Sequence, residues 1–463
     1  MNVPGLGAAD DALSQPPLVI RPADLRAPAM AAPAQRRPGG RGSRLLAGAV
    51  PAAPLATPTT GYWPLAWAAG IFLVAALMVR VIELVPKLAA IRPAIISTAV
   101  LGILFWSRTS ASVIRSALHD RQVRLLAAYA AWGVFTTPFA LYRSAAFKAL
   151  YGFPFALFLT VALLLIAPTS RNLSRLLGGY LGSVALYCLI IAVRGLDLGN
   201  NRLTTGGMYD PNDLAGMIAM TIPFGLHYTI RTRGVLRRGA AALATVVLLV
   251  VIAKTASRGG LLALVAGLLV FAAGQRWTRT VWLAPVILAL SVVFWSLAPA
   301  TFRARAASIL SYQEDYNMTS EVGRVEIWKR GIGYVRDHPL TGVGMDNFAE
   351  AEGRTFAQRG FVGKWFTAHN AYIQAFAELG ILGGCLFISM LWLAAKRALP
   401  FWRPAAAARH GVAHNPAIFA SFAAFATSAF FLSHAYAFLF FGLMALIGFA
   451  HRVASPQAAT ARG

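Results

Sequence analysis

The segment TAHNAYIQAFAELGILGG, Thr367–Gly384, places a histidine and an asparagine directly before a long apolar run. The chain of 463 residues has only eight histidines, so His369 beside Asn370 at this junction is a candidate for chemistry. A histidine titrates near neutral pH and can serve as a general base. It can equally be a hydrogen-bonded residue at the start of a helix, and the residue types alone leave both roles open.

Further polar residues stand at two other junctions between polar and apolar sequence. The stretch NRLTTGGMYDPNDLAG holds Arg202, followed by Asp210 and Asn212 around a proline, which is also the pattern of a plain helix cap. Lys254 and Arg258 lie in a short turn between two apolar runs. Ionisable residues at such a place are functional candidates, although long cationic side chains can also snorkel to lipid headgroups.

A third junction is the long polar stretch EVGRVEIWKRGIGYVRDHPLTGVGMDNF. We expect an amphipathic helix at the membrane surface, headed by Arg324 and ended by the Pro- and Gly-rich PLTGVG turn. Its apolar face is predicted from residues at helical spacing: Val325, Trp328, Ile332 and Val335. Arg324 could also be a solvated residue of that helix.

The composition indicates a polytopic α-helical membrane protein. Hydrophobic residues make up 57% of the chain, charged residues only 13%, and the mean hydropathy is +0.60. Apolar runs of about 20 residues, the length that spans a bilayer, recur along it. The net charge of +25 could indicate nucleic-acid binding, but the arginines flank apolar runs, so we expect no nucleic-acid partner. The two cysteines, Cys188 and Cys385, are expected to be small buried hydrophobes.

About twelve transmembrane helices are predicted, and basic residues concentrate in alternate connections between them. The positive-inside rule then puts both termini in the cytoplasm and His369 on the outer side. The spans are expected near 62–80, 92–107, 124–141, 149–168, 174–194, 212–230, 240–254, 259–274, 281–298, 370–394, 416–432 and 435–450.

The predicted organisation has five parts. They are a disordered cytoplasmic tail (1–60), an N-terminal bundle of about nine spans (61–298), one large periplasmic loop containing amphipathic helices (299–369), C-terminal transmembrane helices (370–452) and a cytoplasmic tail (453–463).

The outer side thus gathers several cations and a histidine without a dense cluster of carboxylates. Arginines can bind and neutralise a diphosphate leaving group, and a histidine can take the proton from an attacking hydroxyl. This inventory fits transfer of a glycan from a lipid diphosphate. The chain shows no HxxxH, CxxC or paired-acid pattern with ligand spacing, so we expect no metal or other cofactor.

Four pieces of the chain resemble the O-antigen ligases and O-antigen polymerases of bacterial envelopes. They are GRVEIWKRGIGYVRDHPLTGVGMDNF, HNAYIQAFAELGILGG, SRGGLLAL and DPNDLAG, and the similarity covers about 200–395. The resemblance implies a GT-C-type glycosyltransferase that moves a glycan from undecaprenyl diphosphate to an acceptor hydroxyl in the periplasm, with inversion and without a metal. His369 matches the base proposed in that family, and Arg258 and Arg324 match its essential arginines.

The remaining candidates follow from the same resemblance and the same side of the membrane. We expect the substrate to be bound by Arg202, Lys254, Asn370, Asp210 and Asn212. Glu378 matches the family's glutamate before the Gly-rich end of the helix, and we expect a structural role for it. His434, on the same side, is a second candidate for the base.

The resemblance does not separate a polymerase of O-antigen or exopolysaccharide repeats from a ligase that transfers the polymer to lipid A core or to protein. We expect a polymerase in the inner membrane, in contact with membrane lipids and with other polysaccharide assembly proteins. A transporter is disfavoured because the polar groups lie in outer connections and the sequence shows no repeat symmetry. A non-catalytic scaffold would tolerate loss of His369.

Overall fold

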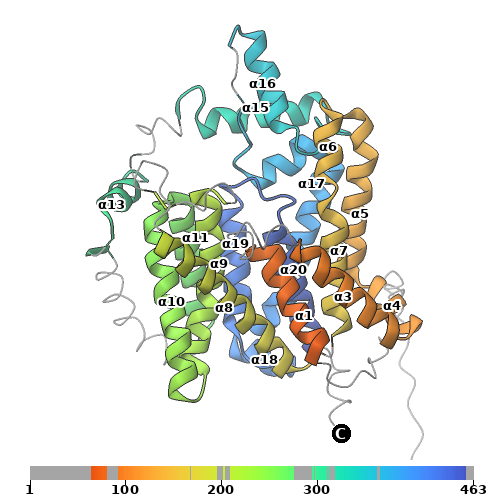
Figure 1. The fold of residues 1–463 in the computed structure, drawn as a ribbon. Helices are drawn as coiled ribbons and strands as arrows, with labels where there is room; N and C mark the ends of the chain where they lie inside the picture. The colour runs from red at the N-terminus through yellow and green to blue at the C-terminus, as the bar shows by residue number, and fades with distance from the viewer. Residues whose placement is uncertain are drawn as a thin grey trace, which may run out of the picture. The chain divides into compact units, whose positions relative to one another are not determined.

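The structure of the protein is a computed structural model (Figure 1). It describes residues 64–80, 92–166, 168–194, 202–203, 209–275, 295–296, 298–309, 311, 319–361 and 365–454. All of these lie in one compact unit, Pro54–Gly463. The predicted tail 1–60, nearly all of the tail 453–463 and most of the predicted span 281–298 lie outside the described residues.

All regular secondary structure in the described ranges is helical, so the predicted all-α class is confirmed. The helices are α1 (Pro64–Val74), η1 (Ala75–Val79), α3 (Pro93–Arg108), α4 (Ala111–Leu118), α5 (Arg121–Thr136), η3 (Thr137–Phe139), α6 (Arg143–Ala149), α7 (Gly152–Leu165), α8 (Ser170–Arg194), α9 (Pro211–Arg231), α10 (Val235–Thr255), α11 (Arg258–Ala273), α13 (Ala300–Ala307), α15 (Arg324–Asp337), α16 (Phe348–Gln358), α17 (Ala371–Ala398), η5 (Leu399–Phe401), α18 (Pro404–Arg409), α19 (Pro416–Ser428) and α20 (Phe438–Val453).

Four helical stretches are long and apolar enough to cross a membrane: Arg143–Leu165, Ser170–Arg194, Val235–Thr255 and Ala371–Phe401. Shorter apolar helices accompany them in the described part of the chain. Every predicted span except 281–298 overlaps one of the helices. The number of twelve spans and the GT-C architecture stay predictions.

Helix α9 is the buried centre of one half of the bundle. It packs against α8, α10, α11 and α19, and its residues from Leu214 to Phe224 are buried on all sides. A helix that is apolar all round needs such a surrounding. Its first turn lies at the same end of the bundle as α15 and α16, whereas α18 lies at the opposite end (Figure 1).

Helix α17 is interrupted at Gly380, whose backbone has φ 68° and ψ −173°. The break leaves carbonyl groups without their helical partners, and the PLTGVG turn fills the gap. Val343 N donates to Ala377 O (2.9 Å), and Gly344 N donates to Glu378 O (2.9 Å). On the far side of the break, Ile381 N donates to Pro339 O (2.8 Å).

Two further contacts complete this junction. The indole Nε1 of Trp132 donates to Leu379 O at 2.8 Å. The buried carboxylate of Glu378 accepts from Asp346 N (2.8 Å) and Phe348 N (3.0 Å). The expected structural role of Glu378 is therefore confirmed, because its side chain organises the turn that leads into α16.

The opposite end of α17 is held by a buried ion pair. Arg397 Nη2 lies 2.9 Å from Asp120 Oδ2, and its Nη1 donates to Gln122 Oε1 at 2.9 Å. The side chains of Arg397 and Asp120 are 8% and 10% exposed, so both charges are buried but paired. This pair ties the end of α17 to the start of α5.

Only part of the predicted apolar face of α15 packs inside the protein, where Trp328 and Val335 join a small cluster around Ile327, and its place at the membrane surface stays a prediction. The helix begins at Arg324 as expected, but its buried residues are Ile327 and Gly331, and Ile332 is 61% exposed. The reason is the partner: α15 packs closely on α17, and a Cβ at Gly331 would lie 2.5 Å from Ile373 Cγ2. A glycine marks the contact face here, which a pattern of large apolar residues does not reveal.

The two cysteines also differ from each other. Both are free, and Cys188 is buried as expected, but Cys385 is exposed on α17. An apolar run in a membrane protein has a face that points away from the bundle, so membership of the run does not predict burial.

Replacing Gly380 by alanine should destabilise the protein. Its φ and ψ lie in a region open almost only to glycine, and a Cβ there would contact Leu340 O, so we expect a loss of about 1–3 kcal/mol or more. Thermal unfolding in detergent measures this. Gly333→Ala is the matched control, since Gly333 lies in helix α15 with open space around its Cβ and should tolerate the change. Equal melting temperatures for the two variants would contradict the role of Gly380.

Candidate functional site

Several helix ends meet at the α15 end of the bundle. Here α9, α11, α17 and α20 begin, and α10 and α19 end. Direct hydrogen bonds join these ends: Leu203 N donates to Lys254 O (3.0 Å), and Ala371 N donates to Ala429 O (2.7 Å). The structure therefore brings together the polar junctions that the sequence places far apart.

Asn212 is the hub of the first cluster. Its Oδ1 accepts from Ser257 Oγ (2.9 Å) and from Arg202 Nη2 (3.1 Å), while Arg202 Nε donates to Thr255 O (3.0 Å). Asp210 caps α9, with Oδ1 accepting from the backbone N–H groups of Asn212 and Asp213 (both 2.7 Å). Asp210 thus caps α9, whereas Asn212 joins α9 to the turn before Arg258 and orients Arg202.

Arg258 is the first residue of α11. Ser257 caps this helix by accepting from Gly260 N (3.1 Å), and Arg258 Nη1 donates to Ser308 Oγ (3.0 Å). Arg305 of α13 joins the same turn, with Nε donating to Ala256 O (2.8 Å). Sequence reasoning missed Arg305. The only signal of Arg305 in the sequence is the pair of arginines in FRARA, and a pair of arginines in a polar loop does not stand out from its surroundings.

The side chain of Lys254, another predicted binding residue, is exposed in the last turn of α10. Its backbone carbonyl is the group that accepts from Leu203. The structure therefore shows a backbone contact of Lys254 in the cluster, and its ammonium group faces outward.

Positive charge accumulates in this region. The pKa of Arg202 is lowered to about 10, first by burial and then by the charges of Arg305, Arg324 and Arg258, while Asp210 opposes this shift. Guanidinium groups that disfavour one another are stabilised when an anion binds between them. In the part of the chain that the structure describes, no group of three His, Cys, Asp or Glu side chains could hold a metal ion.

His369 sits in a left-handed backbone conformation, with φ 45°. Its N–H donates to Ser433 Oγ (2.9 Å), and its Nε2 lies 3.3 Å from Thr367 Oγ1. Asn370 is buried and caps α17, because its Oδ1 accepts from two N–H groups in the first turn, at 3.0 and 3.1 Å. The structure thus shows a capping role for Asn370, and its part in binding the substrate stays a prediction.

The surroundings of His369 favour its neutral form. Burial lowers its pKa below the usual value near 6.5, and the charge of Arg324 lowers it further, whereas Asp210 and Asp213 oppose this shift. A neutral imidazole at neutral pH can accept a proton. His369 is therefore favoured in the protonation state that a base requires.

Helix α15 brings Arg324 to this histidine. Trp328 Nε1 donates to Ala368 O (3.1 Å), the carbonyl directly before His369. The same indole packs edge-on against Phe430, with 5.7 Å between ring centroids. Arg324 is the first residue of the helix and lies one turn before Trp328. The contact of Trp328 therefore fixes the position of the Arg324 backbone relative to His369.

His434, the second candidate for the base, is bound to another residue of the site. Its Nε2 lies 2.8 Å from Asp213 Oδ1, and the side chain is 7% exposed. Sequence reasoning missed Asp213, although it stands in the quoted DPNDLAG stretch. The contact joins α9 to the segment between α19 and α20, a pairing over more than two hundred residues that no local pattern reveals.

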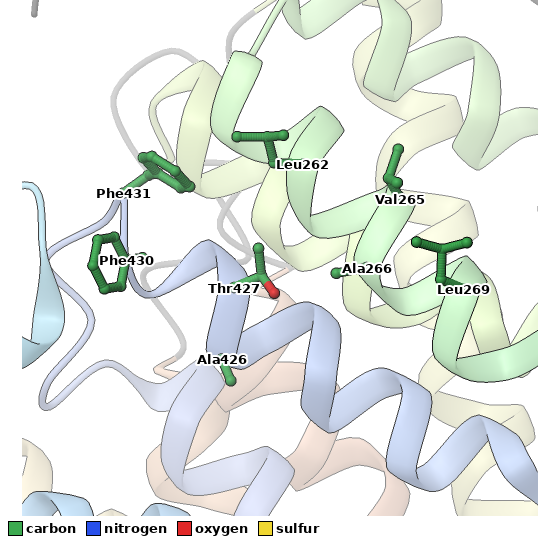
Figure 2. A pocket seen from close by; sticks show the side chains of 8 residues that line it. All are labelled: Leu262, Val265, Ala266, Leu269, Ala426, Thr427, Phe430 and Phe431. Carbon is green, nitrogen blue, oxygen red and sulfur yellow. The ribbon is translucent and has the colours of Figure 1, made fainter. Parts of the chain in front are cut away.

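An apolar groove runs beside the arginines, between α11 and the end of α19 (Figure 2). Its volume is about 560 Å³, and it is lined by Leu262, Val265, Ala266, Leu269, Ala426, Thr427, Phe430 and Phe431. Phe431 closes on Gly259, the residue after Arg258: a Cβ at Gly259 would lie 2.9 Å from Phe431 Cβ. One wall of the groove therefore adjoins the cationic cluster, which consists of Arg202, Arg258, Arg305 and Arg324.

Comparison with known families agrees with this placement. Residues 243–388 match the family model described as O-antigen ligase, so the resemblance drawn from the motifs is confirmed. No curated protein matches the chain. The family match supports a function of the O-antigen ligase or polymerase type in an integral membrane protein. Arg258, Arg324 and His369 lie inside the matched segment, whereas Asp213 and His434 lie outside it.

The cationic cluster should bind inorganic diphosphate. Because charge-assisted hydrogen bonds contribute about 1.5–3 kcal/mol, we expect Arg258→Gln and Arg324→Gln each to weaken binding by about tenfold or more. Isothermal titration of the purified protein measures this. Arg336→Gln is the control, since Arg336 is exposed in the last turn of α15 and its loss should leave the affinity unchanged. Equal losses in all three variants would mean that the cluster is not the binding site.

Proposed function

We propose that the protein is a glycosyltransferase that moves a glycan from undecaprenyl diphosphate to an acceptor hydroxyl at the outer face of the inner membrane. The observation that carries this proposal is a partly buried histidine with a lowered pKa beside clustered arginines, inside a segment that matches the O-antigen ligases. Basic residues of the predicted connections at the other end favour cytoplasmic termini and a periplasmic site.

In the proposed reaction, the imidazole of His369 takes the proton from the acceptor hydroxyl as the hydroxyl oxygen attacks the anomeric carbon. The bond between that carbon and the phosphate oxygen breaks, and its electron pair leaves with the diphosphate. Arg258, Arg324 and Arg202 stabilise the negative charge that develops there. A single displacement inverts the anomeric centre. In this scheme the arginines supply the positive charge that a metal ion supplies elsewhere.

The groove between α11 and α19 supports a lipid-linked donor. It is apolar, adjoins Arg258 through Gly259 and Phe431, and Leu269 and Phe430 in its walls are 65% and 49% exposed. An isoprenoid chain lying there would place its diphosphate at the arginines. Lipid-exposed apolar residues are ordinary in a membrane protein, so the position of the groove carries more weight than its polarity.

We propose that the acceptor is another repeat unit, so that the protein polymerises O-antigen or exopolysaccharide repeats. A ligase that delivers the polymer to lipid A core or to a protein is the second candidate, and the description of the matched family favours it. Both use the same donor chemistry and the same residues. They differ only in which hydroxyl reaches His369.

A transfer assay tests the enzyme. Purified protein with the undecaprenyl-diphosphate-linked glycan of its host should extend the lipid-linked glycan in the presence of EDTA. His369→Ala should lower the rate by about 10²–10⁴-fold, the usual contribution of a general base, and Arg258→Ala should lower it comparably through lost charge stabilisation. The product is resolved by chain length on a gel.

Other results of this assay have definite meanings. Product that appears only after lipid A core or protein is added would identify a ligase. Full activity in His369→Ala would show that this histidine is only a helix-entry residue. Loss of activity with EDTA, restored by a metal ion, would contradict the metal-independent mechanism. Gly333→Ala serves as the folded control, because its side chain would point into open space.

The pH dependence gives an independent test. A base with a lowered pKa is neutral, and therefore active, down to pH values below its ordinary pKa, so the acid limb of kcat/KM should lie below pH 6.5. Arg324→Gln removes a cation that disfavours the imidazolium, so it should move this limb to higher pH. Rates measured from about pH 5 to 8 show the limb. An unchanged limb in Arg324→Gln would place the titrating group elsewhere.

A further inference from the structure

The segment 429–437 is hydrogen-bonded to the turn that carries His369 and to the start of α17. Three hydrogen bonds do this: Ala371 N donates to Ala429 O (2.7 Å), His369 N donates to Ser433 Oγ (2.9 Å), and Ala435 N donates to Gln374 Oε1 (3.2 Å). A non-glycine residue in the left-handed region needs such support, because its conformation is sparsely populated on its own. The position of this segment therefore sets the position of the histidine.

The same segment is anchored to α9 through His434. Its Nε2 lies 2.8 Å from Asp213 Oδ1, and Asp213 itself stands in the capped first turn of α9, with its N–H bonded to Asp210 Oδ1 (2.7 Å). His434 follows Ser433 in the chain. The same short segment therefore bonds to Asp213 through His434 and to His369 through Ser433. A shift of the Asp213–His434 pair would be passed directly to His369.

His434 donates to Asp213 through one ring nitrogen. Since the carboxylate only accepts, Nε2 carries the proton of this hydrogen bond. The other nitrogen, Nδ1, is buried and has no hydrogen-bond partner among the described residues. The contact between His434 and Asp213 therefore fixes the position of the Asp213 carboxylate.

The negative charge of Asp213 can stabilise His369 once this histidine has taken up a proton. His369 becomes positive when it takes a proton, yet its neighbourhood already contains Arg324 together with the other arginines. The charged groups that act on it are Arg324 from α15 and Asp210 and Asp213 at the start of α9, while the segment 429–437 adds Ser433 and His434. Asp210 is exposed, and its Oδ1 accepts the two capping bonds of α9. Asp213 is the carboxylate that a side chain from a distant segment holds in place.

We propose that Asp213, clamped by His434, is a positioning residue for His369: it holds the histidine in place and supplies the negative charge that allows it to accept a proton among arginines. This inference rests on the proposed function. It assigns a role to two polar side chains, Asp213 and His434, that lie outside the segment matching the O-antigen ligases.

Three variants of the full-length protein test it in the transfer assay with the undecaprenyl-diphosphate-linked glycan. Asp213→Asn keeps the shape and removes the charge. We expect kcat to fall on the order of ten- to a hundredfold with little change in KM, and the acid limb to move to lower pH, because the imidazolium loses a stabilising anion. This shift is opposite to that expected for Arg324→Gln. Glu350→Gln, which alters a carboxylate paired with Arg354 on α16, is the control and should leave the limb in place.

His434 is tested by a conservative and a disruptive change. His434→Gln retains an N–H donor for Asp213 and should keep most of the activity and the wild-type limb. His434→Leu removes the donor and should lose activity by about as much as Asp213→Asn. A purely structural histidine would not make the limb depend on this donor. A His434→Gln variant as inactive as His434→Leu would mean that the ring itself takes part, which overturns the assignment.

The outcomes separate the inference from the function. If the wild type is active and the acid limb of Asp213→Asn is unshifted, the protein is still a glycosyltransferase, but Asp213 does not have the proposed role. A folded wild type that transfers no glycan to any acceptor at any pH removes the proposed function itself. Thermal unfolding shows whether Asp213→Asn is folded. If it is not, the comparison of His434→Gln with His434→Leu decides the question.

Discussion

The break in α17 at Gly380 is the constraint on which the site depends. An interrupted helix exposes carbonyl and N–H groups, and in an apolar surrounding each unsatisfied group costs several kcal/mol. The chain meets this cost with the PLTGVG turn and the indole of Trp132, which bond to the groups on both sides of the break. The PLTGVG turn before α17 therefore docks on the bundle at one defined point and cannot dock elsewhere without losing these bonds.

Once that turn is docked, the remaining geometry follows. Glu378 binds the N–H groups of Asp346 and Phe348 and sets the start of α16. A buried ion pair between Arg330 and Glu352, with 2.6 Å between Nη2 and Oε2, joins α16 to α15. Trp328 then fastens α15 to the carbonyl before His369. A chain of satisfied polar contacts thus leads from the break in α17 to the relative placement of Arg324 and His369.

The electrostatics of the site balance two demands. Anion binding calls for several guanidinium groups close together, and burial together with the charges of the neighbouring arginines lowers the pKa of Arg202. A histidine base in the same place is driven toward its neutral form, which helps it to start the reaction but opposes the charge it must then carry. The capped first turn of α9, with Asp210 and Asp213, supplies the opposite sign without placing a carboxylate between the arginines and an anion.

Local chemistry made much of this protein predictable from its sequence. Long apolar runs indicated the helices, the Asp-Pro pair predicted the start of α9, and Arg324 was expected to head α15, because capping and periodicity are set by neighbours in the chain. Motif spacing also led to the family that the matched segment confirms. Tertiary structure alone decided which side chains meet. The buried face of α15, the contribution of Arg305 and the pairing of Asp213 with His434 all depend on contacts between distant segments. Such contacts leave no period or spacing in the sequence, because their geometry exists only once the helices have packed.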